Sequence, residues 1–399
     1  MEKIRKMLFI FGMAVFALGM FSVNAVAQEG DVVIGMRKTM VGVYDDKGNV
    51  VFQPQKKDID GASYEHINAH GLNLLCSGDE PKTVIIPSGS VVEIDYTVRI
   101  GDNTTLIADG ATIIQTTDGR GVLSSNVDKV NYGSLKNVKI QGGTWKSAKN
   151  KKAASMMRFA HGQNLVIDGA TVITNYEGHA VELIAMKNTI VQNCTLKAVG
   201  KSRKNSVEEA LQIDIATPKT APGVAKEFGT KYTTGQTCKN ISILNNTISG
   251  SRGVCANFAS VEPKYKNKFH DGITIIGNKL TGKSAEGLAL FNTLNATVKN
   301  NVIVSNSTRK SEAYSVGFNV AVMGKAPSGI KKAKVTVQNN TIKGGRQGMQ
   351  IITKTSSKYG AAVIKGNKLY ASAGKKSALF VSKKAVSKIK QSKNKLYKR

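Results

Sequence analysis

The sequence predicts an all-β solenoid of about ten to twelve rungs, closed at its N-terminal end by a helix. Short segments with alternating apolar residues recur along the chain, with starts 24 to 43 residues apart and mostly near 30. A small polar turn with a recurrent asparagine follows one family of these segments. No apolar stripe of 3.6-residue period accompanies the repeat, and Asn, Gly and Thr are too frequent for helical repeats. Strands that repeat at this spacing cannot bury an apolar face alone, so they stack on one another.

The first residues have the pattern of a secretory signal peptide. Basic residues precede an apolar run from residue 7 to about residue 23, and small residues follow it. We expect cleavage after Ala27 and no membrane span thereafter, since no second apolar run of spanning length follows. The protein is then secreted, and is extracellular or associated with the cell surface. The expected parts are residues 1–27 as signal peptide, residues 28–57 as N-terminal extension and residues 58–399 as the solenoid.

The solenoid begins with a helix and a group of closely spaced strands. The segment DIDGASYEHINAHGLNLL, residues 58–75, predicts the capping helix. The segment KTVIIPSGSVVEIDYTVRIGDNTTLIADGATI, residues 82–113, alternates in short runs that Pro and Gly interrupt. These runs predict the first rungs.

One family of strands ends at a turn with asparagine in a fixed column. The column contains Asn246, Asn278, Asn301, Asn340, Asn367 and Asn394. Asparagine tolerates the left-handed backbone of a sharp turn, so we expect that conformation at these positions. Asparagines stacked in register can also hydrogen-bond to one another along a ladder.

A second family of strands alternates with the first. Its members include HAVELIA from residue 179 and EALQIDI from residue 209. The third and fifth residues of these segments are apolar, as in Leu211 and Ile213, and we expect them to face the core.

The chain resembles right-handed parallel β-helix proteins of the pectate lyase-like superfamily over about residues 58–396. The pattern V-x-I-P-x-G at residues 84–89, followed by N-T-T-L at residues 103–106, is similar to the first rungs of that group. The runs YEGHAVEL and EALQIDI look like those of a subgroup of secreted bacterial members with no settled reaction. The resemblance implies the fold. It implies no particular reaction, because the superfamily includes lyases, hydrolases, epimerases and non-catalytic binders. Of the motifs of polygalacturonase-type hydrolases, this chain has only G-H-A at residues 178–180.

Polar residues gather on one side of about four neighbouring strands of the second family. In EEALQIDIA, Gln212 and Asp214 alternate with core residues, so we expect both to face solvent. Aligning the strands gives three polar columns: Arg158, Glu182 and Gln212; Asp214 and Asn257; and His179, Glu209, Arg252 and Glu286. The first two columns predict a saccharide site. The third is either part of that site or a ladder of salt bridges.

The longest insertions follow the same strands. They span residues 216–237 and 259–270, and insertions in solenoids tend to gather on the binding face. Their aromatic residues either stack on sugar rings or pack within the loops. The candidates for sugar contact near these strands are Tyr176, Tyr232, Tyr265, Phe228, Phe269 and His161.

Two enzymatic interpretations fit these residues, and the first is β-elimination. A base removes the proton next to a uronate carboxylate, and a cation stabilises the developing charge. The base would be His179 or His161, and Arg158 or Arg252 would neutralise the carboxylate. No cofactor motif is evident; a bound Ca²⁺ would need oxygen ligands. Such ligands would come from Glu182, Glu209 and Asp214.

The second enzymatic interpretation is glycoside hydrolysis by two carboxylates. Glu182 and Asp214 lie one rung and two residues apart, which gives a diagonal of about 8 Å at the backbone. Separations of roughly 6.5–9.5 Å accompany inversion at the sugar. The expected catalytic residues are thus Glu182, Asp214, His179 and Arg252. The alternative is a surface protein that binds a glycan or the cell wall without catalysis.

The charge of the chain points to an anionic partner. The chain has 57 Lys and Arg against 27 Asp and Glu, a net charge of +30. Residues 301–399 contain 22 of these cations and one acid, Glu312, and supply +21. An exported protein does not meet nucleic acid as its usual partner, so we expect the cationic surface to bind an anionic polysaccharide or cell-wall polymer. The alternative is a lysine-rich surface that serves solubility alone.

The four cysteines are too few and too irregularly spaced for a disulfide scaffold. We expect them to be small buried hydrophobes. No zinc-binding spacing is present.

Overall fold

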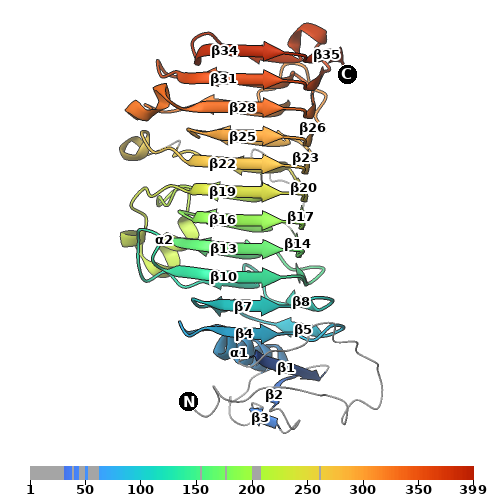
Figure 1. The fold of residues 1–399 in the computed structure, drawn as a ribbon. Helices are drawn as coiled ribbons and strands as arrows, with labels where there is room; N and C mark the ends of the chain where they lie inside the picture. The colour runs from blue at the N-terminus through green and yellow to red at the C-terminus, as the bar shows by residue number, and fades with distance from the viewer. Residues whose placement is uncertain are drawn as a thin grey trace.

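Three long sheets wind around one core to form a parallel β-helix (Figure 1). The computed structural model describes residues 31–37, 40–44, 50–52, 63–152, 155–175, 178–199, 208–259 and 262–399. Each rung contributes one strand to each sheet, and corresponding strands of successive rungs pair in parallel. The sheets have 14, 11 and 10 strands, and 11 of the 14 lie after residue 81, so the rung number agrees with the predicted ten to twelve. The predicted signal peptide lies outside the described residues.

The 14-stranded sheet faces the viewer in Figure 1. Its strands are β1 (Asp31–Arg37), β2 (Met40–Tyr44), β3 (Val50–Phe52), β4 (Lys82–Ile85), β7 (Thr104–Ile107), β10 (Leu135–Gln141), β13 (Gly162–Asp168), β16 (Lys187–Gln192), β19 (Lys239–Leu244), β22 (Asp271–Ile276), β25 (Ala296–Lys299), β28 (Lys334–Gln338), β31 (Tyr359–Lys365) and β34 (Val386–Ser392).

The 11-stranded sheet follows the asparagine turns. Its strands are β5 (Val91–Ile94), β8 (Thr112–Gln115), β11 (Thr144–Ser147), β14 (Thr171–Thr174), β17 (Thr195–Ala198), β20 (Thr247–Gly250), β23 (Lys279–Gly282), β26 (Val302–Ser305), β29 (Thr341–Gly344), β32 (Lys368–Ala371) and β35 (Lys395–Lys398).

The 10-stranded sheet contains the second predicted family of strands. Its members are β6 (Val98–Ile100), β9 (Leu123–Ser125), β12 (Met157–Ala160), β15 (Val181–Ile184), β18 (Glu209–Asp214), β21 (Arg252–Ala256), β24 (Leu288–Phe291), β27 (Val316–Val322), β30 (Gln347–Thr353) and β33 (Leu379–Val381).

Helices are short and lie at the end of the solenoid or in its loops. The α-helices are α1 (Tyr64–Cys76) and α2 (Pro222–Phe228). The 3₁₀ turns are η3 (Thr230–Tyr232), η4 (Pro263–Tyr265), η5 (Ser328–Lys331) and η6 (Lys375–Ser377). In the described part of the chain, none of the helices has the length and apolar character needed to cross a membrane.

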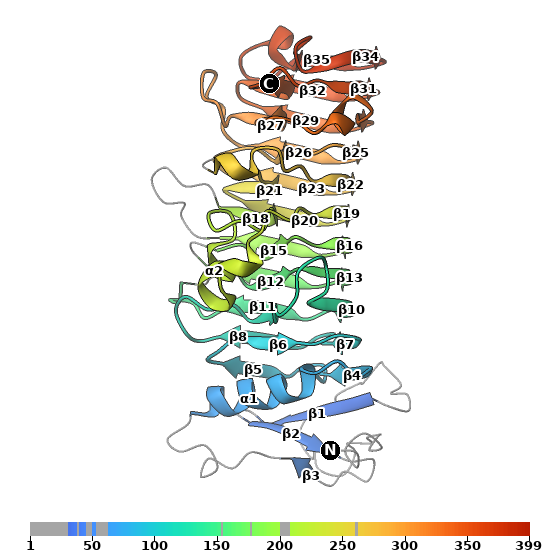
Figure 2. The ribbon, with the colours of Figure 1, turned by 90° about the vertical axis from the view of Figure 1, so that its left-hand side faces the viewer.

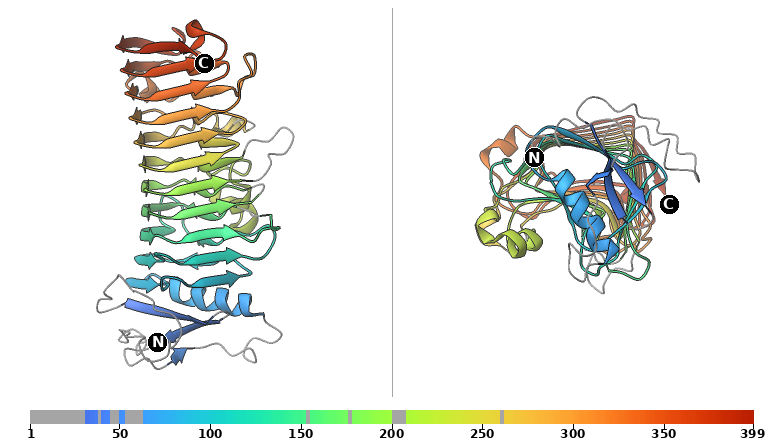
Figure 3. Two further views of the ribbon diagram at one scale, coloured as in Figure 1. Left: turned by 90° about the vertical axis from the view of Figure 1, so that its right-hand side faces the viewer. Right: turned by 90° about the horizontal axis from the view of Figure 1, so that it is seen from below.

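Helix α1 closes the N-terminal end of the solenoid, as predicted (Figure 3, right). Ser63 caps it by accepting a hydrogen bond from the His66 N–H, and Ile67 and Leu72 are buried. Strands β1 to β3 lie within the expected N-terminal extension. β1 pairs in parallel with β4, so the extension continues the 14-stranded sheet.

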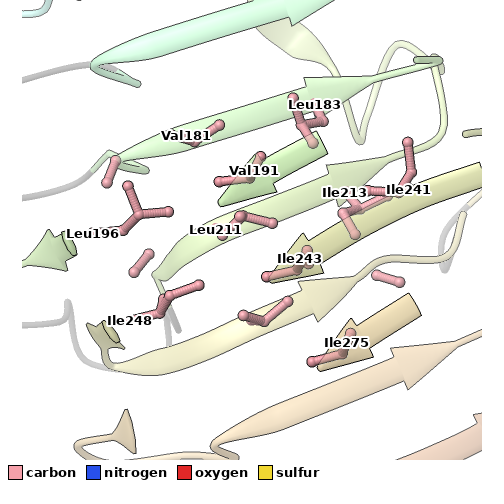
Figure 4. Packing of buried hydrophobic residues seen from close by; sticks show 14 of the residues in the cluster. Val181, Leu183, Val191, Leu196, Leu211, Ile213, Ile241, Ile243, Ile248 and Ile275 are labelled. Atoms are coloured by element: carbon pink, nitrogen blue, oxygen red, sulfur yellow. The ribbon is translucent and has the colours of Figure 1, made fainter. Parts of the chain in front are cut away.

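The core consists of inward-facing residues in register from rung to rung (Figure 4). Val181 lies opposite Leu211, and Leu183 lies opposite Ile213. All four side chains are fully buried, which confirms the prediction from alternation. Full burial of such a side chain contributes about 1.5–3 kcal/mol.

The asparagine column forms the predicted ladder inside the turns. Asn301 Nδ2 donates to Ile275 O at 2.9 Å and to Asn340 Oδ1 at 2.9 Å. The same contacts recur from Asn246 to Asn394. The prediction of a left-handed backbone at these asparagines was wrong, and the left-handed conformation is found at other residues. It occurs one residue earlier, as at Asn300 (φ 56°), because the ladder side chain turns inward to bond main-chain carbonyls.

Candidate functional site

The polar columns have the predicted register on the 10-stranded sheet. Arg158 lies opposite Glu182, which lies opposite Gln212. Ile184 lies opposite Asp214, so Glu182 and Asp214 are one rung and two residues apart. Figure 2 shows β12, β15 and β18 stacked beside α2.

The prediction that these side chains face solvent was wrong. Glu182 is 4% exposed, Gln212 is 7% exposed and Asp214 is 0% exposed. The insertion of residues 216–237 folds back over this face as α2 and η3. Its Val224 packs in one apolar cluster with Ile184. Outward positions of these strands are therefore buried beneath a second layer.

Glu182 is held by a buried ion pair. Arg158 Nε lies 2.6 Å from Glu182 Oε2, and the Ser155 hydroxyl donates to the same oxygen at 2.5 Å. Burial alone would raise the pKa of the Glu182 carboxyl, but Arg158, His179 and Ser155 together hold that pKa below its ordinary value. Glu182 is thus ionised.

Asp214 has the opposite electrostatic environment. Gln212 Nε2 donates to Asp214 Oδ1 at 2.9 Å. Asp214 Oδ2 and Gln212 Oε1 are buried and have no hydrogen-bond partner among the described residues. Burial, and then the charge of Glu182, raise the pKa of Asp214 well above its ordinary value. Two neighbouring carboxyls with opposite pKa shifts are the arrangement that acid–base catalysis uses.

The third column is a ladder of buried salt bridges, as the structural interpretation predicted. Arg252 lies between two acids, with Nη1 2.5 Å from Glu209 Oε1 and Nε 2.9 Å from Glu286 Oε2. His179 Nδ1 lies 2.7 Å from the Glu209 carbonyl oxygen and 3.8 Å from Glu209 Oε2. Asn319 Nδ2 extends the ladder by donating to Glu286 Oε1. These side chains satisfy one another.

The expected calcium ligands do not form a cluster. In the ranges that the structure describes, no group of three His, Cys, Asp or Glu side chains is arranged to hold a metal ion. Glu182 is paired with Arg158, and Glu209 is paired with Arg252.

The remaining predicted site residues mostly support the loops. His161 is buried, with Nε2 2.7 Å from the Tyr232 carbonyl oxygen, and burial lowers the pKa of its imidazole. Tyr265 is also buried, and its hydroxyl donates to Thr233 O. The Asn257 carbonyl oxygen lies 3.0 Å from His270 Nε2. Tyr176 lies outside the described residues. The alternative that the aromatic residues pack within the loops is confirmed for Tyr265, whereas Phe269 is buried in the main core.

Sequence reasoning missed two hollows on another face. One, of about 440 Å³, lies over β22, β25 and β28 of the 14-stranded sheet. The second, of about 430 Å³, lies where the loops before β19 and β22 meet. A row of threonines at equivalent positions of β22, β25 and β28 was the available signal for the first hollow.

The sheets and their turns define a right-handed parallel β-helix protein. No protein-family model matches the sequence, and no curated protein is similar to it in sequence.

Solved structures share the fold at low sequence identity. PfbA, a surface adhesin of Streptococcus pneumoniae, is 14% identical over 85% of this chain and 90% of its own, with a TM-score of 0.52. A family 28 exopolygalacturonase of Yersinia enterocolitica is 11% identical over 89% of this chain and 80% of its own, with a TM-score of 0.51. At these identities the likeness shows the fold alone.

Proposed function

We propose that the protein binds an anionic polysaccharide, such as a uronic-acid polymer or an anionic cell-wall polymer, on the outer surface of its last rungs. The observation that carries the proposal is the charge of residues 301–399, which hold 22 Lys and Arg and one acid. That acid, Glu312, is already paired with Arg309 at 3.0 Å. The last rungs therefore present cations without neutralising partners of their own.

The arrangement of these lysines is costly without a ligand. Lys368 lies opposite Lys395 on adjacent strands of the 11-stranded sheet, and both are exposed. Adjacent strands are about 4.8 Å apart, and like charges directly opposite each other are destabilising. A polyanion that lies across the rungs would relieve this repulsion. Exposed cations on several successive rungs of a solenoid suit an extended polymer.

The comparisons support this proposal in a general way. The two solved structures described above are a surface adhesin and an exopolygalacturonase, so the fold accommodates both attachment and action on a polysaccharide. We further propose export, on the basis of residues 1–27. N-terminal sequencing of the mature protein should then begin at Gln28, and an N-terminus at Met1 would contradict export.

A second candidate function is glycoside hydrolysis by Glu182 and Asp214. The observation that favours it is the opposite shift of their two pKa values, with Asp214 as the acid and Glu182 as the base. Both carboxyls are buried, and residues 216–237 pack on the neighbouring Ile184, so a substrate would reach the carboxyls only after this loop moves away. Elimination has less support, because His161 and His179 are engaged with main-chain carbonyl groups.

One experiment separates the two functions. The purified protein is mixed with polygalacturonate and with neutral dextran, at low and high salt, and retention is measured together with reducing ends and ultraviolet absorbance. Binding predicts salt-sensitive retention on polygalacturonate alone, without products. Equal retention on dextran, or none on polygalacturonate at low salt, would contradict the proposal. New reducing ends without absorbance would instead support hydrolysis.

A further inference from the structure

We infer that the outer face of the 14-stranded sheet carries a groove for an acidic oligosaccharide, formed by the hollow over β22, β25 and β28 and the adjoining hollow between the loops. The inference rests on the proposed function for its ligand class. It assigns that ligand to residues outside the polar columns, and mostly before the last rungs.

The two hollows adjoin. Asp271 and Leu294 line the hollow between the loops. The next residue after each, Gly272 and Asn295, lines the hollow on the sheet. Asn295 Nδ2 donates to Asp271 Oδ1 at 2.7 Å, which fixes the junction. The two hollows therefore meet at this junction, one between the loops and the other over the strands.

The floor of the groove on the sheet is a row of hydroxyl groups. Thr274 lies opposite Thr297, which lies opposite Thr336, and all three are half-buried in the lining. Neighbouring members are about 4.8 Å apart across the strands. Each hydroxyl both donates and accepts hydrogen bonds, as the hydroxyls of a sugar do. Threonine is also frequent on ordinary strand faces, so the row alone does not define a site.

Lysines flank this row on either side along the strand direction. Lys299 lies opposite Gln338, and Lys334 precedes Gln338 by four residues. The two lysines are thus about 13 Å apart along the strand direction. Lys239 and Lys268 line the adjoining hollow. Among the described residues, none of these four ammonium groups takes part in a salt bridge.

The groove contains one acid and an apolar wall. The acid, Asp271, is engaged with Asn295, so the groove is cationic overall. Leu294 and Pro327, both half-buried, provide apolar surface beside Tyr132. A wall of this kind with a few placed polar groups is typical of small-ligand sites.

Tyr132 is held in a strained position beside the groove. It has φ 65° and follows Asn131 with φ 57°, and such a backbone is an outlier for a bulky residue. Its hydroxyl donates to Thr237 O at 2.9 Å, which ties the two loops together. Strained residues persist where the surrounding contacts fix them, and they cluster at ligand sites.

Together these groups match a ring with hydroxyls and a carboxylate. Lysines alone would accept any polyanion, including an acidic peptide or polyphosphate. The threonine row adds hydroxyl groups that can bond to sugar hydroxyls, and the apolar wall adds a surface on which a sugar ring can pack. A peptide or a polyphosphate would not use both. The ligand class that fits is a short uronic-acid oligosaccharide.

The test measures affinity for a short oligogalacturonate and for an oligoglutamate peptide of the same charge. Wild type should bind the sugar more tightly than the peptide. Lys299→Ala with Lys334→Ala should weaken sugar binding about tenfold, since charged hydrogen bonds are lost. Thr297→Val with Thr336→Val should reduce the preference for sugar over peptide, and Thr297→Ser with Thr336→Ser should restore it. The matched control, Lys139→Ala with Lys197→Ala, removes two exposed strand lysines outside the groove and should bind within about twofold of wild type.

The outcomes separate this inference from the proposed function. If wild type binds no oligogalacturonate, both fail. If charge reversal on the last rungs weakens binding while the Lys299 and Lys334 variant matches its control, the proposed function stands and the groove is overturned. If the valine variant keeps its melting temperature and the full sugar preference, the groove is a general cationic surface and the inference is wrong. If the valine variant has a lower melting temperature, the serine variant decides the question, because it keeps the hydroxyls. A serine variant without the sugar preference would overturn the inference.

Discussion

Arg158 Nε lies 2.6 Å from Glu182 Oε2, and this buried ion pair joins two adjacent rungs beneath α2. The pair neutralises a carboxylate that the overlying loop removes from water. The outer face of β12, β15 and β18 is therefore buried as well as the inner face, and it contains a separate apolar cluster and buried charged groups.

Glu182→Gln should destabilise the protein by about 2 kcal/mol, because it leaves the Arg158 guanidinium without its counter-charge. The pKa of Glu182 is lowered on folding, so its contribution is present above the ordinary pKa of a glutamate and is lost as pH falls through the folded value. Urea unfolding at pH 7 measures the change. Glu312→Gln, at an exposed ion pair, is the control and should change stability by less than about 0.5 kcal/mol. Equal effects of the two variants would contradict the buried pair.

Asp214→Asn should gain stability relative to wild type as pH rises. Because the pKa of Asp214 is raised on folding, the folded state holds the proton more tightly, and wild-type stability falls as pH rises above about 4 toward the folded pKa. The asparagine variant has no such proton. Urea unfolding at pH 5 and pH 8 should show a difference from wild type that grows with pH, whereas Asp128→Asn at an exposed site should show a constant one. A constant difference for Asp214→Asn would disprove the raised pKa.

Asn301→Ala should cost about 3 kcal/mol or more, because it removes several buried hydrogen bonds at once. Asn301 Nδ2 donates to two main-chain carbonyls and to Asn340 Oδ1, and Asn301 Oδ1 accepts from Asn278. Asn137 belongs to an exposed ladder in which Asn137 Nδ2 donates to Asn103 Oδ1, so Asn137→Ala is the matched control. Thermal unfolding should rank Asn301→Ala well below Asn137→Ala, and the reverse order would contradict the internal ladder.

The four cysteines should not react with a thiol reagent in the folded protein. All four are free and buried, and burial raises the pKa of Cys76 and Cys238 to about 12. A colorimetric thiol assay at pH 8 should find four thiols in denaturant and almost none without it. Rapid labelling of the folded protein would show that the cysteines are accessible.

The fold was predictable from the sequence because its signals are local. Alternation at Leu211 and Ile213 identifies the core face, and the column from Asn246 to Asn394 sets the register of the turns. The covering of Asp214 was not predicted, because it depends on where the loop of residues 216–237 folds. A signal did exist. Ile184 is an apolar residue at an outward position, and an outward isoleucine indicates a second layer.

The groove was harder to predict than the columns. The row from Thr274 to Thr336 is visible once the register is known, but a flat strand face and a groove share that pattern. Its depth comes from loop residues such as Phe269 and Pro327, which lie far apart in the sequence.

The central claim is that the last rungs bind an anionic polysaccharide, and charge reversal tests it most directly. The variant changes four residues together to Glu: Lys383, Lys384, Lys388 and Lys390. Its affinity for polygalacturonate is measured at low salt and compared with that of wild type, once the two proteins are shown to have the same melting temperature. All four lysines are exposed, so the fold should tolerate the change. The account predicts that affinity falls at least about tenfold and that most of its salt dependence is lost. Unchanged affinity in a folded variant would assign these lysines to solubility alone and contradict the proposed function.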